Sequence, residues 1–176
     1  SISHEGYADK PAYAYWDDFW ALRGYQDAVQ IAQALGQPAL ARRWAGWRDE
    51  FARELSASIA MTAGHYRLDH IAGAADRGDL DASSTTMALN PAQMQDRLAA
   101  PLLQGTFERY WVQALARAEG RLAWKDYTPY ELRNVSALLR LGLPERAHRL
   151  LDFFFRDQRP AGWNQWAEVV LPDPRE

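Results

Sequence analysis

Cysteine is absent from the 176-residue sequence, which excludes disulfide bonds, thiolate metal sites and cysteine nucleophiles. Long hydrophobic runs are also lacking, so we find no candidate membrane span and no signal peptide. The formal net charge is −3 and no Lys/Arg stripe is present, so we expect neither nucleic acid nor a membrane as partner. The first residue is Ser rather than Met, which we interpret as a mature product or an excised piece.

Several sequence signatures of catalysis are lacking as well. There is no Gly-rich phosphate loop and no G-x-S-x-G elbow, and no serine has a convincing His/Asp pairing. The histidines have no recognised metal-ligand spacing, so we expect no metal site: His4, His65, His70 and His148.

The composition is that of a globular protein, with 48% hydrophobic and 24% charged residues. The length suits one domain with a real core and gives no reason to expect two. The informative excess is aromatic, because the chain has eight Trp and eight Tyr, many of them beside carboxylates.

Helical periodicity dominates the first third of the chain. One apolar face starts near Asp17, and a second, clearer one follows Pro38. Gly36 suits a helix end and Pro38 a helix start, so the sequence predicts an antiparallel αα-hairpin over residues 17–61. The two faces consist of Phe19, Leu22, Val29, Ala32 and Leu35, and of Leu40, Trp44, Trp47, Phe51, Leu55 and Ile59.

The rest of the chain predicts a long loop over 62–90, helices over 91–157, and a loop with a short helix start over 158–170. Residues 87–89 could form a short strand, and the helix from Pro91 is expected to be interrupted near Pro101. Thr128 and Glu131 have the spacing of a capping box. Gly142 and Pro144 repeat the break of the first hairpin, so we predict an all-α fold of consecutive antiparallel αα-hairpins.

Residues 15–20 read Y-W-D-D-F-W and place two carboxylates among four aromatic rings at a helix start. Aromatic faces stack on sugar rings while carboxylates accept hydrogen bonds from sugar hydroxyls, so the pattern favours carbohydrate binding. The alternative is that Asp17 caps the helix and the rings fill the core. The candidate binding residues are Trp16, Asp17, Asp18 and Trp20.

Residues 78–90 read G-D-L-D-A-S-S-T-T-M-A-L-N and lie between helical patterns. Asp79 and Asp81 stand beside four consecutive hydroxyl residues, which is typical of a loop that carries catalytic or binding side chains. Asp, Ser and Thr are also ordinary turn and N-cap residues, and this alternative stays open.

Two later segments, 124–131 and 163–170, repeat the combination of aromatics and acids. Glu168 lies among Trp166, Val169 and Val170, surroundings that could raise its pKa or require a partner. The candidate binding residues here are Trp124, Tyr130, Glu131, Trp163, Asn164, Gln165 and Trp166.

Taken in order, Y-W-D-D-F-W, G-D-L-D-A-S-S-T-T, Y-T-P-Y-E-L-R-N-V and R-P-A-G-W-N-Q-W-A-E-V-V resemble the six-hairpin α/α-toroid glycosidases. These are enzymes of the glucoamylase, trehalase and processing-glucosidase type. The resemblance implies inverting hydrolysis of a glycosidic bond in an oligo- or polysaccharide, without a cofactor. It implies an acid at Asp81 or Asp79 and a base at Glu168, with Asp81 preferred because hydroxyl neighbours can orient it.

The same resemblance implies that the chain is part of a toroid, because a closed ring has twelve helices and the periodicity predicts about five or six. We therefore expect incomplete catalysis, and self-association or pairing with the remaining part of the domain. We also expect Asp17, Asp18, Glu131, Glu168 and the loop acid to open onto one face. The alternative function is a non-catalytic α-helical binding or scaffold module.

Overall fold

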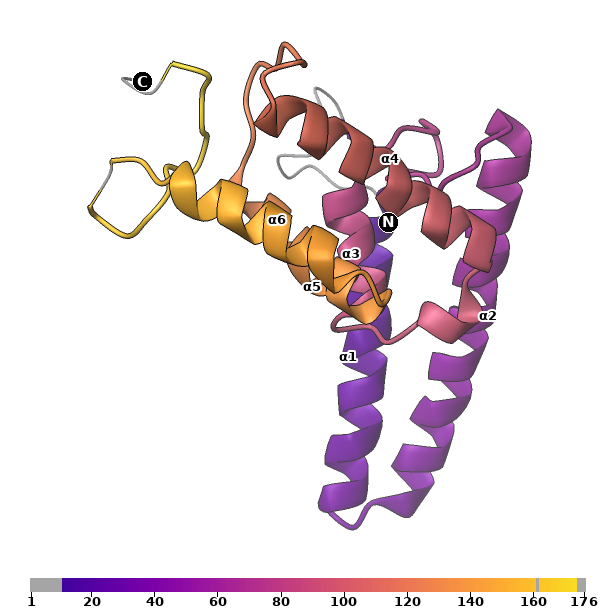
Figure 1. Cartoon of the computed structure of the whole chain (residues 1–176). Coiled ribbons are helices and arrows are strands. Elements are labelled where there is room, and N and C mark those ends of the chain that lie inside the picture. The colour runs from indigo at the N-terminus through magenta and orange to yellow at the C-terminus, as the bar shows by residue number, and fades with distance from the viewer. Residues whose placement is uncertain (1–10, 161, 174–176) are drawn as a thin grey trace. The chain divides into compact units, whose positions relative to one another are not determined.

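The computed structural model describes residues 11–160 and 162–173, and every regular element in this part of the chain is a helix (Figure 1). The chain forms two compact units, Ser1–Thr106 and Phe107–Glu176, and the boundary falls inside helix α4. The prediction of an all-α fold is therefore confirmed.

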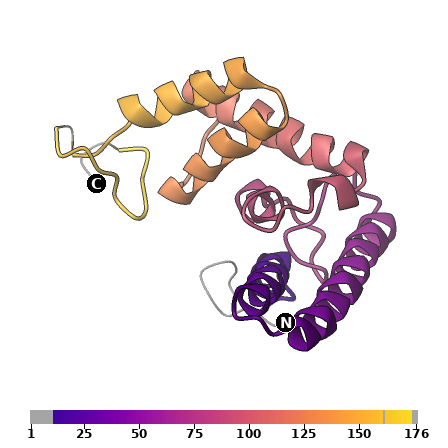
Figure 2. The same ribbon diagram turned by 90° about the horizontal axis from the view of Figure 1, so that it is seen from below.

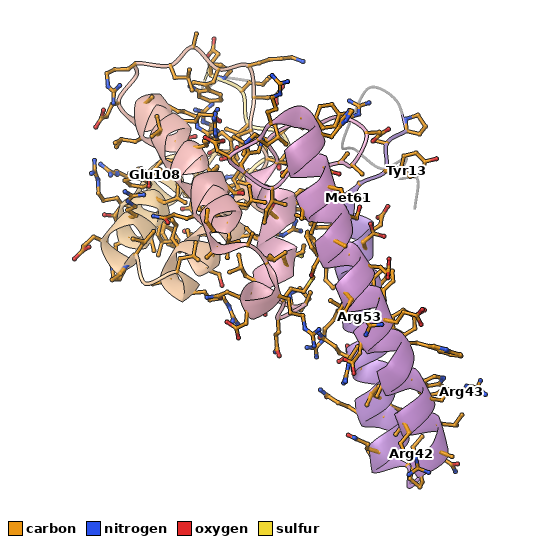
Figure 3. All side chains as sticks on the ribbon, turned by 90° about the vertical axis from the view of Figure 1, so that its right-hand side faces the viewer. Tyr13, Arg42, Arg43, Arg53, Met61 and Glu108 are labelled. Atoms are coloured by element: carbon orange, nitrogen blue, oxygen red, sulfur yellow. The ribbon has the colours of Figure 1, made fainter. Side chains whose placement is uncertain are left out.

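The first unit is built on the hairpin of α1 (Tyr15–Ala34) and α2 (Pro38–Tyr66), which lie side by side in Figures 1 and 2. Gly36 adopts a φ of +65° in the turn, where a side chain would be strained, and Pro38 begins α2 as expected. The predicted hairpin is confirmed, although α2 continues past Gly64. Figure 3 shows Tyr13 and Met61 toward one end of the hairpin and the Arg42–Arg43 pair at the other.

The remaining elements of this unit are α3 (Ala82–Leu89), the 3₁₀ helix η1 (Gln95–Arg97) and the start of α4 (Ala100–Ala118). The predicted loop over 62–90 is therefore wrong at both ends, and residues 87–89 are helical rather than a strand. The helix expected from Pro91 is also wrong, since helix resumes with η1 and Pro101 occupies the first turn of α4.

The start of α4 packs closely on the segment that follows α2. The Ile71 amide donates to the Thr106 hydroxyl at 2.9 Å, and that hydroxyl donates to the Leu102 carbonyl at 2.8 Å. A Cβ at Gly105 would lie 1.8 Å from the Asp69 carbonyl oxygen, so this contact requires glycine. The largest fully buried side chains of the unit include Phe19, Leu22, Ile71, Leu89 and Met94.

The second unit contains the rest of α4, η2 (Pro129–Leu132), α5 (Arg133–Arg140) and α6 (Pro144–Arg156). Gly142 has a φ of +75° and Pro144 begins α6, so the second αα-hairpin is confirmed. The short helix start expected within 158–170 is wrong, because the described residues there form turns, bends and one bridge at Val170. The core includes Phe107, Leu138, Leu150, Phe154 and Val170.

We predict that Gly105→Ala lowers the free energy of unfolding by about 2 kcal/mol or more, because the Asp69 carbonyl leaves no room for a methyl group. The matched control is Gly46→Ala on the exposed face of α2, where an added Cβ meets nothing within 4 Å. That change should raise the free energy of unfolding by about 0.5–1 kcal/mol, since Ala is the better helix former. Urea denaturation of both variants measures the two values, and equal stabilities would contradict the close packing.

Candidate functional site

Short backbone bridges join the start of α1 to the loop that leads into α3. The Tyr15 amide donates to the Gly73 carbonyl at 2.9 Å, and the Gly73 amide donates to the Asp79 carbonyl at 3.0 Å. Ala14 pairs with Ala74 and Ala72 with Leu80 as antiparallel bridges. The first two predicted motifs, 15–20 and 78–90, therefore meet at one end of the first unit.

The turn before these acids depends on Gly78, which has a φ of +65°. A Cβ there would lie 2.6–2.9 Å from ring atoms of Tyr66, the last residue of α2. Glycine is thus needed both for the backbone conformation and for the contact with the ring. The Asp79 side chain then accepts a hydrogen bond from the Ala74 amide at 3.2 Å, which closes the loop.

Asp81 is the N-cap of α3, as its turn-and-cap alternative predicted. Its carboxylate accepts from the Ser84 amide at 2.9 Å and from the Ser84 hydroxyl at 2.5 Å. Burial raises the pKa of Asp81 above its usual value, against the lowering effect of the Ser84 hydrogen bonds. A carboxyl that is oriented by a hydroxyl and kept protonated to higher pH has the properties of a general acid. Ser84 belongs to the run of four hydroxyl residues noted in the sequence, and it is the member that donates to Asp81.

The aromatic and acidic residues of the other motif lie on the first turns of α1. Burial also raises the pKa of Asp18, with a further contribution from neighbouring Asp17. Trp16 and Trp20 meet edge to face with their ring centroids 5.9 Å apart, and Trp20 is 45% exposed. This end of the first unit thus combines two carboxyls of raised pKa with an exposed aromatic face.

An equivalent bridge joins the two predicted motifs of the second unit. The Tyr127 amide donates to the Val170 carbonyl at 3.0 Å, and the Val170 amide donates back to the Tyr127 carbonyl at 2.8 Å. This reciprocal pair joins segments 124–131 and 163–170 at Tyr127 and Val170. Sequence order alone did not show this pairing.

Glu131 is held inside the second unit by charged and polar partners. Its carboxylate accepts from the Arg117 guanidinium at 3.1 and 2.5 Å and from the Tyr110 hydroxyl at 2.9 Å. Burial opposes the charge of Arg117, but Glu131 outweighs it and raises the pKa of Arg117. The capping-box prediction is wrong, because the Thr128 side chain makes no cap hydrogen bond and Glu131 turns toward Arg117.

Aromatic rings enclose the same arginine. The guanidinium carbon of Arg117 lies 5.9 Å from the Trp124 ring centroid, 4.9 Å from that of Tyr127 and 5.7 Å from that of Phe153. Cation–π contacts of this kind favour the charged guanidinium. Trp124 and Glu131 therefore have structural partners within the unit, whatever else they bind.

The last predicted motif lies on an exposed loop. Glu168 is exposed and Val169 is 50% exposed, so the enclosed surroundings expected for the base are not present in the described chain. Trp163 is 69% exposed, whereas the Trp166 indole N–H donates to the Phe154 carbonyl at 2.9 Å. The other members of this motif and of the preceding one, Asn164, Gln165 and Tyr130, are exposed.

Asp157 is an acid that the sequence analysis passed over. It accepts from the Tyr127 hydroxyl at 2.6 Å and from the Arg159 guanidinium at 2.9 Å. It also lines a hollow of about 350 Å³ together with Trp111 and Phe153. Its position directly after an amphipathic helix and before an aromatic loop is the signal that could have marked it.

Two of the three predicted catalytic carboxyls, Asp79 and Asp81, belong to the first unit, and Glu168 belongs to the second. The distance between acid and base and the common face therefore stay predictions. Within the described residues, no three His, Asp or Glu side chains gather closely enough to hold a metal ion. None of the helices in residues 11–160 and 162–173 combines the length and apolar character that a membrane span needs.

The fold and the site define an all-α protein with aromatic and acidic segments paired by backbone bridges. No protein-family model, curated protein or solved structure matches the chain.

We predict that Asp81→Asn gains stability relative to the native chain as the pH rises from about 3 to 7. The folded-state pKa of Asp81 is raised, so folding binds extra protons and native stability falls as the pH rises through that pKa. Asn keeps an N-cap acceptor but has no charge to bury.

Urea denaturation across this pH range measures the difference between the two chains. The control Asp81→Ala loses the cap and should be less stable than Asp81→Asn by about 1 kcal/mol at every pH. A stability difference between Asp81→Asn and the native chain that stays constant with pH would contradict a raised pKa.

Proposed function

We propose that the chain is part of a carbohydrate-active hydrolase that cleaves a glycosidic bond with inversion. The observation that carries the proposal is Asp81, a largely buried carboxyl of raised pKa oriented by Ser84. In this proposal Asp81 protonates the leaving oxygen, with Asp79 as the second candidate, and Glu168 activates a water. An inverting pair of this kind stands about 6.5–9.5 Å apart.

The aromatic end of α1 supports a sugar as the substrate. Trp20 offers an exposed ring for stacking, and Asp18 lies on the same turn to accept a hydroxyl hydrogen bond. The bridges through Gly73 hold this end beside the Asp79–Asp81 loop. Stacking and acid catalysis are thus supported by one continuous part of the first unit.

The partner in this proposal is further helical hairpins of a toroid or a second copy of the chain. One side of the α1–α2 hairpin has an apolar hollow of about 380 Å³ lined by Ala21, Gly24, Ala28, Trp44 and Trp47. Nearby Ile31 is 58% exposed and Trp47 is 44% exposed. Exposed apolar surface of this kind tends to be covered by partners. Without them the catalytic groups are less firmly held, so we expect low turnover from the chain alone.

The second candidate function is a non-catalytic binding module. It is favoured by the second unit, where the Glu131 carboxylate is paired with Arg117 and the Glu168 carboxylate is exposed to solvent. The exposed Trp163 ring can bind a sugar or a peptide by stacking, without catalysing a reaction. The two candidates differ in whether bound sugar is turned over.

We predict that Asp81→Asn, made in the full-length parent enzyme, lowers the turnover of a glycosidase substrate by about 10²–10⁴, the usual effect of losing a general acid. The assay follows release of reducing sugar from a panel of α- and β-linked disaccharides, with the first product anomer read by proton NMR. Inversion is the expected stereochemistry.

The matched controls are Asp79→Asn, which tests the second candidate acid, and Asp76→Asn, an exposed acid of the same loop. Asp76→Asn should leave turnover unchanged. Unchanged turnover in both Asp79→Asn and Asp81→Asn would remove the acid from this loop. Saturable sugar binding without any turnover would favour the binding module.

A further inference from the structure

A second, polar hollow lies on the α1–α2 hairpin, where the segment around η1 covers part of it. Its volume is about 410 Å³, which is in the range of small-molecule pockets. Leu22, Val29, Ala52 and Met94 supply apolar walls, and the polar residues come from both helices and from the covering segment. All of the lining residues belong to the first unit.

One lining residue, Gln26, has a side-chain oxygen without a hydrogen-bond donor among the described residues. The Gln26 side-chain amide donates to the Ala92 carbonyl at 2.6 Å, which fixes the orientation of the carboxamide. Its Oε1 atom is buried and receives no hydrogen bond from the part of the chain that the structure describes. A buried acceptor without a donor is unfavourable, so a hydroxyl or N–H group that reaches this atom, from a ligand or from water, would be stabilising.

The covering segment is held in place independently of that acceptor. The Arg23 guanidinium donates to the Pro91 carbonyl at 3.3 Å and to the Asp27 carboxylate at 3.0 Å. Together with the Gln26 bond to Ala92, this contact fixes residues 91–92 against α1. These contacts hold the covering segment against α1 just before Gln93 and Met94, which line the hollow.

The opposite wall has a net positive charge. Arg48 binds the Asp49 carboxylate at 2.9 Å, and the guanidinium of Arg97 lies 3.8 Å from the same oxygen. The hydrogen bond from Arg48 lowers the pKa of Asp49, so that carboxyl is ionised at neutral pH. Two guanidinium groups facing one carboxylate leave one positive charge for an anion, and guanidinium suits carboxylate ligands.

The remaining polar residues are amides. Gln30 and Gln33 line the hollow from α1 and Gln93 lines it from the covering segment. A carboxamide both donates and accepts hydrogen bonds, which matches the mixed demands of sugar hydroxyls. The lining thus combines an acceptor in need of a donor, a net positive charge and several amides.

We propose that this hollow binds a small polyhydroxylated carboxylate of monosaccharide size, such as a sugar acid. A ligand hydroxyl donates to Gln26 Oε1, the ligand carboxylate binds Arg48 and Arg97, and the amides bind other hydroxyls. The site contains none of the residues proposed for hydrolysis, so this proposal does not depend on the proposed function and is tested independently of it.

The test uses D-gluconate as the probe and sorbitol, its neutral counterpart of the same chain length, as the comparison. Binding to the full chain is measured by titration calorimetry and by NMR shifts of the glutamine side-chain amides. We expect gluconate to bind more tightly than sorbitol, and its affinity to fall with added salt. Gluconate should shift the Gln26 amide signals.

Two variants and one control sharpen the test. Gln26→Leu should weaken gluconate by about tenfold, because the acceptor is lost. Asp49→Asn should bind gluconate about threefold more tightly, because it frees both guanidinium groups. Gln37→Leu, at the exposed start of α2 and outside the hollow, should bind like the native chain.

The variant Asp49→Asn keeps the test decisive even where Gln26→Leu fails to fold. Equal binding of sorbitol and gluconate, or weaker gluconate binding by Asp49→Asn, would overturn the proposal. It would also be overturned if neither probe bound and a high-resolution structure placed only water on Gln26 Oε1.

Discussion

The first unit depends on the backbone hydrogen bonds that cross Gly73. This residue accepts from the Tyr15 amide and donates to the Asp79 carbonyl, so one residue connects the start of α1 to the loop before α3. The hydroxyl of Tyr15 adds a second anchor through Ser58 and Thr62 of α2, at 2.9 and 2.8 Å. Without these contacts the aromatic and acidic motifs would be separate features of separate helices.

Two carboxylates that look alike in sequence receive opposite environments. The Asp81 carboxylate accepts from the amide and the hydroxyl of Ser84, and burial raises its pKa. Glu131 faces the buried guanidinium of Arg117, so its charge is compensated inside the protein. A buried ion pair is strongly destabilising when one partner is removed, which marks Glu131 as a structural residue. Asp81 thus differs from Glu131 in that burial raises its pKa, whereas a guanidinium compensates the charge of Glu131.

Local signals in the sequence identified the two hairpins, whereas the helix α3 and the partner of Glu131 depend on tertiary contacts that the sequence does not show. Gly36 and Gly142 are each followed two residues later by a proline, and both pairs mark real helix breaks. The sequence predicts loop for the hydroxyl run after Asp81, yet the run forms α3, because Asp81 caps the helix and most of its residues are buried. The Thr85 and Thr86 hydroxyls bond to carbonyls of the preceding turn. Such local bonding is compatible with a helix when the surrounding core buries it. The side-chain environment of Glu131 depends on Arg117, and no local sequence pattern connects these two residues.

Backbone bridges pair the aromatic and acidic segments within each unit, and amide hydrogen exchange tests this pairing most directly. We expect the amides of Tyr15, Gly73, Tyr127 and Val170 to exchange slowly, on the order of 100-fold slower than that of exposed Glu168. Val170 is the most informative, because it lies in the same exposed loop as Glu168. Exchange of Val170 and Gly73 as fast as that of Glu168 would contradict the pairing of these segments.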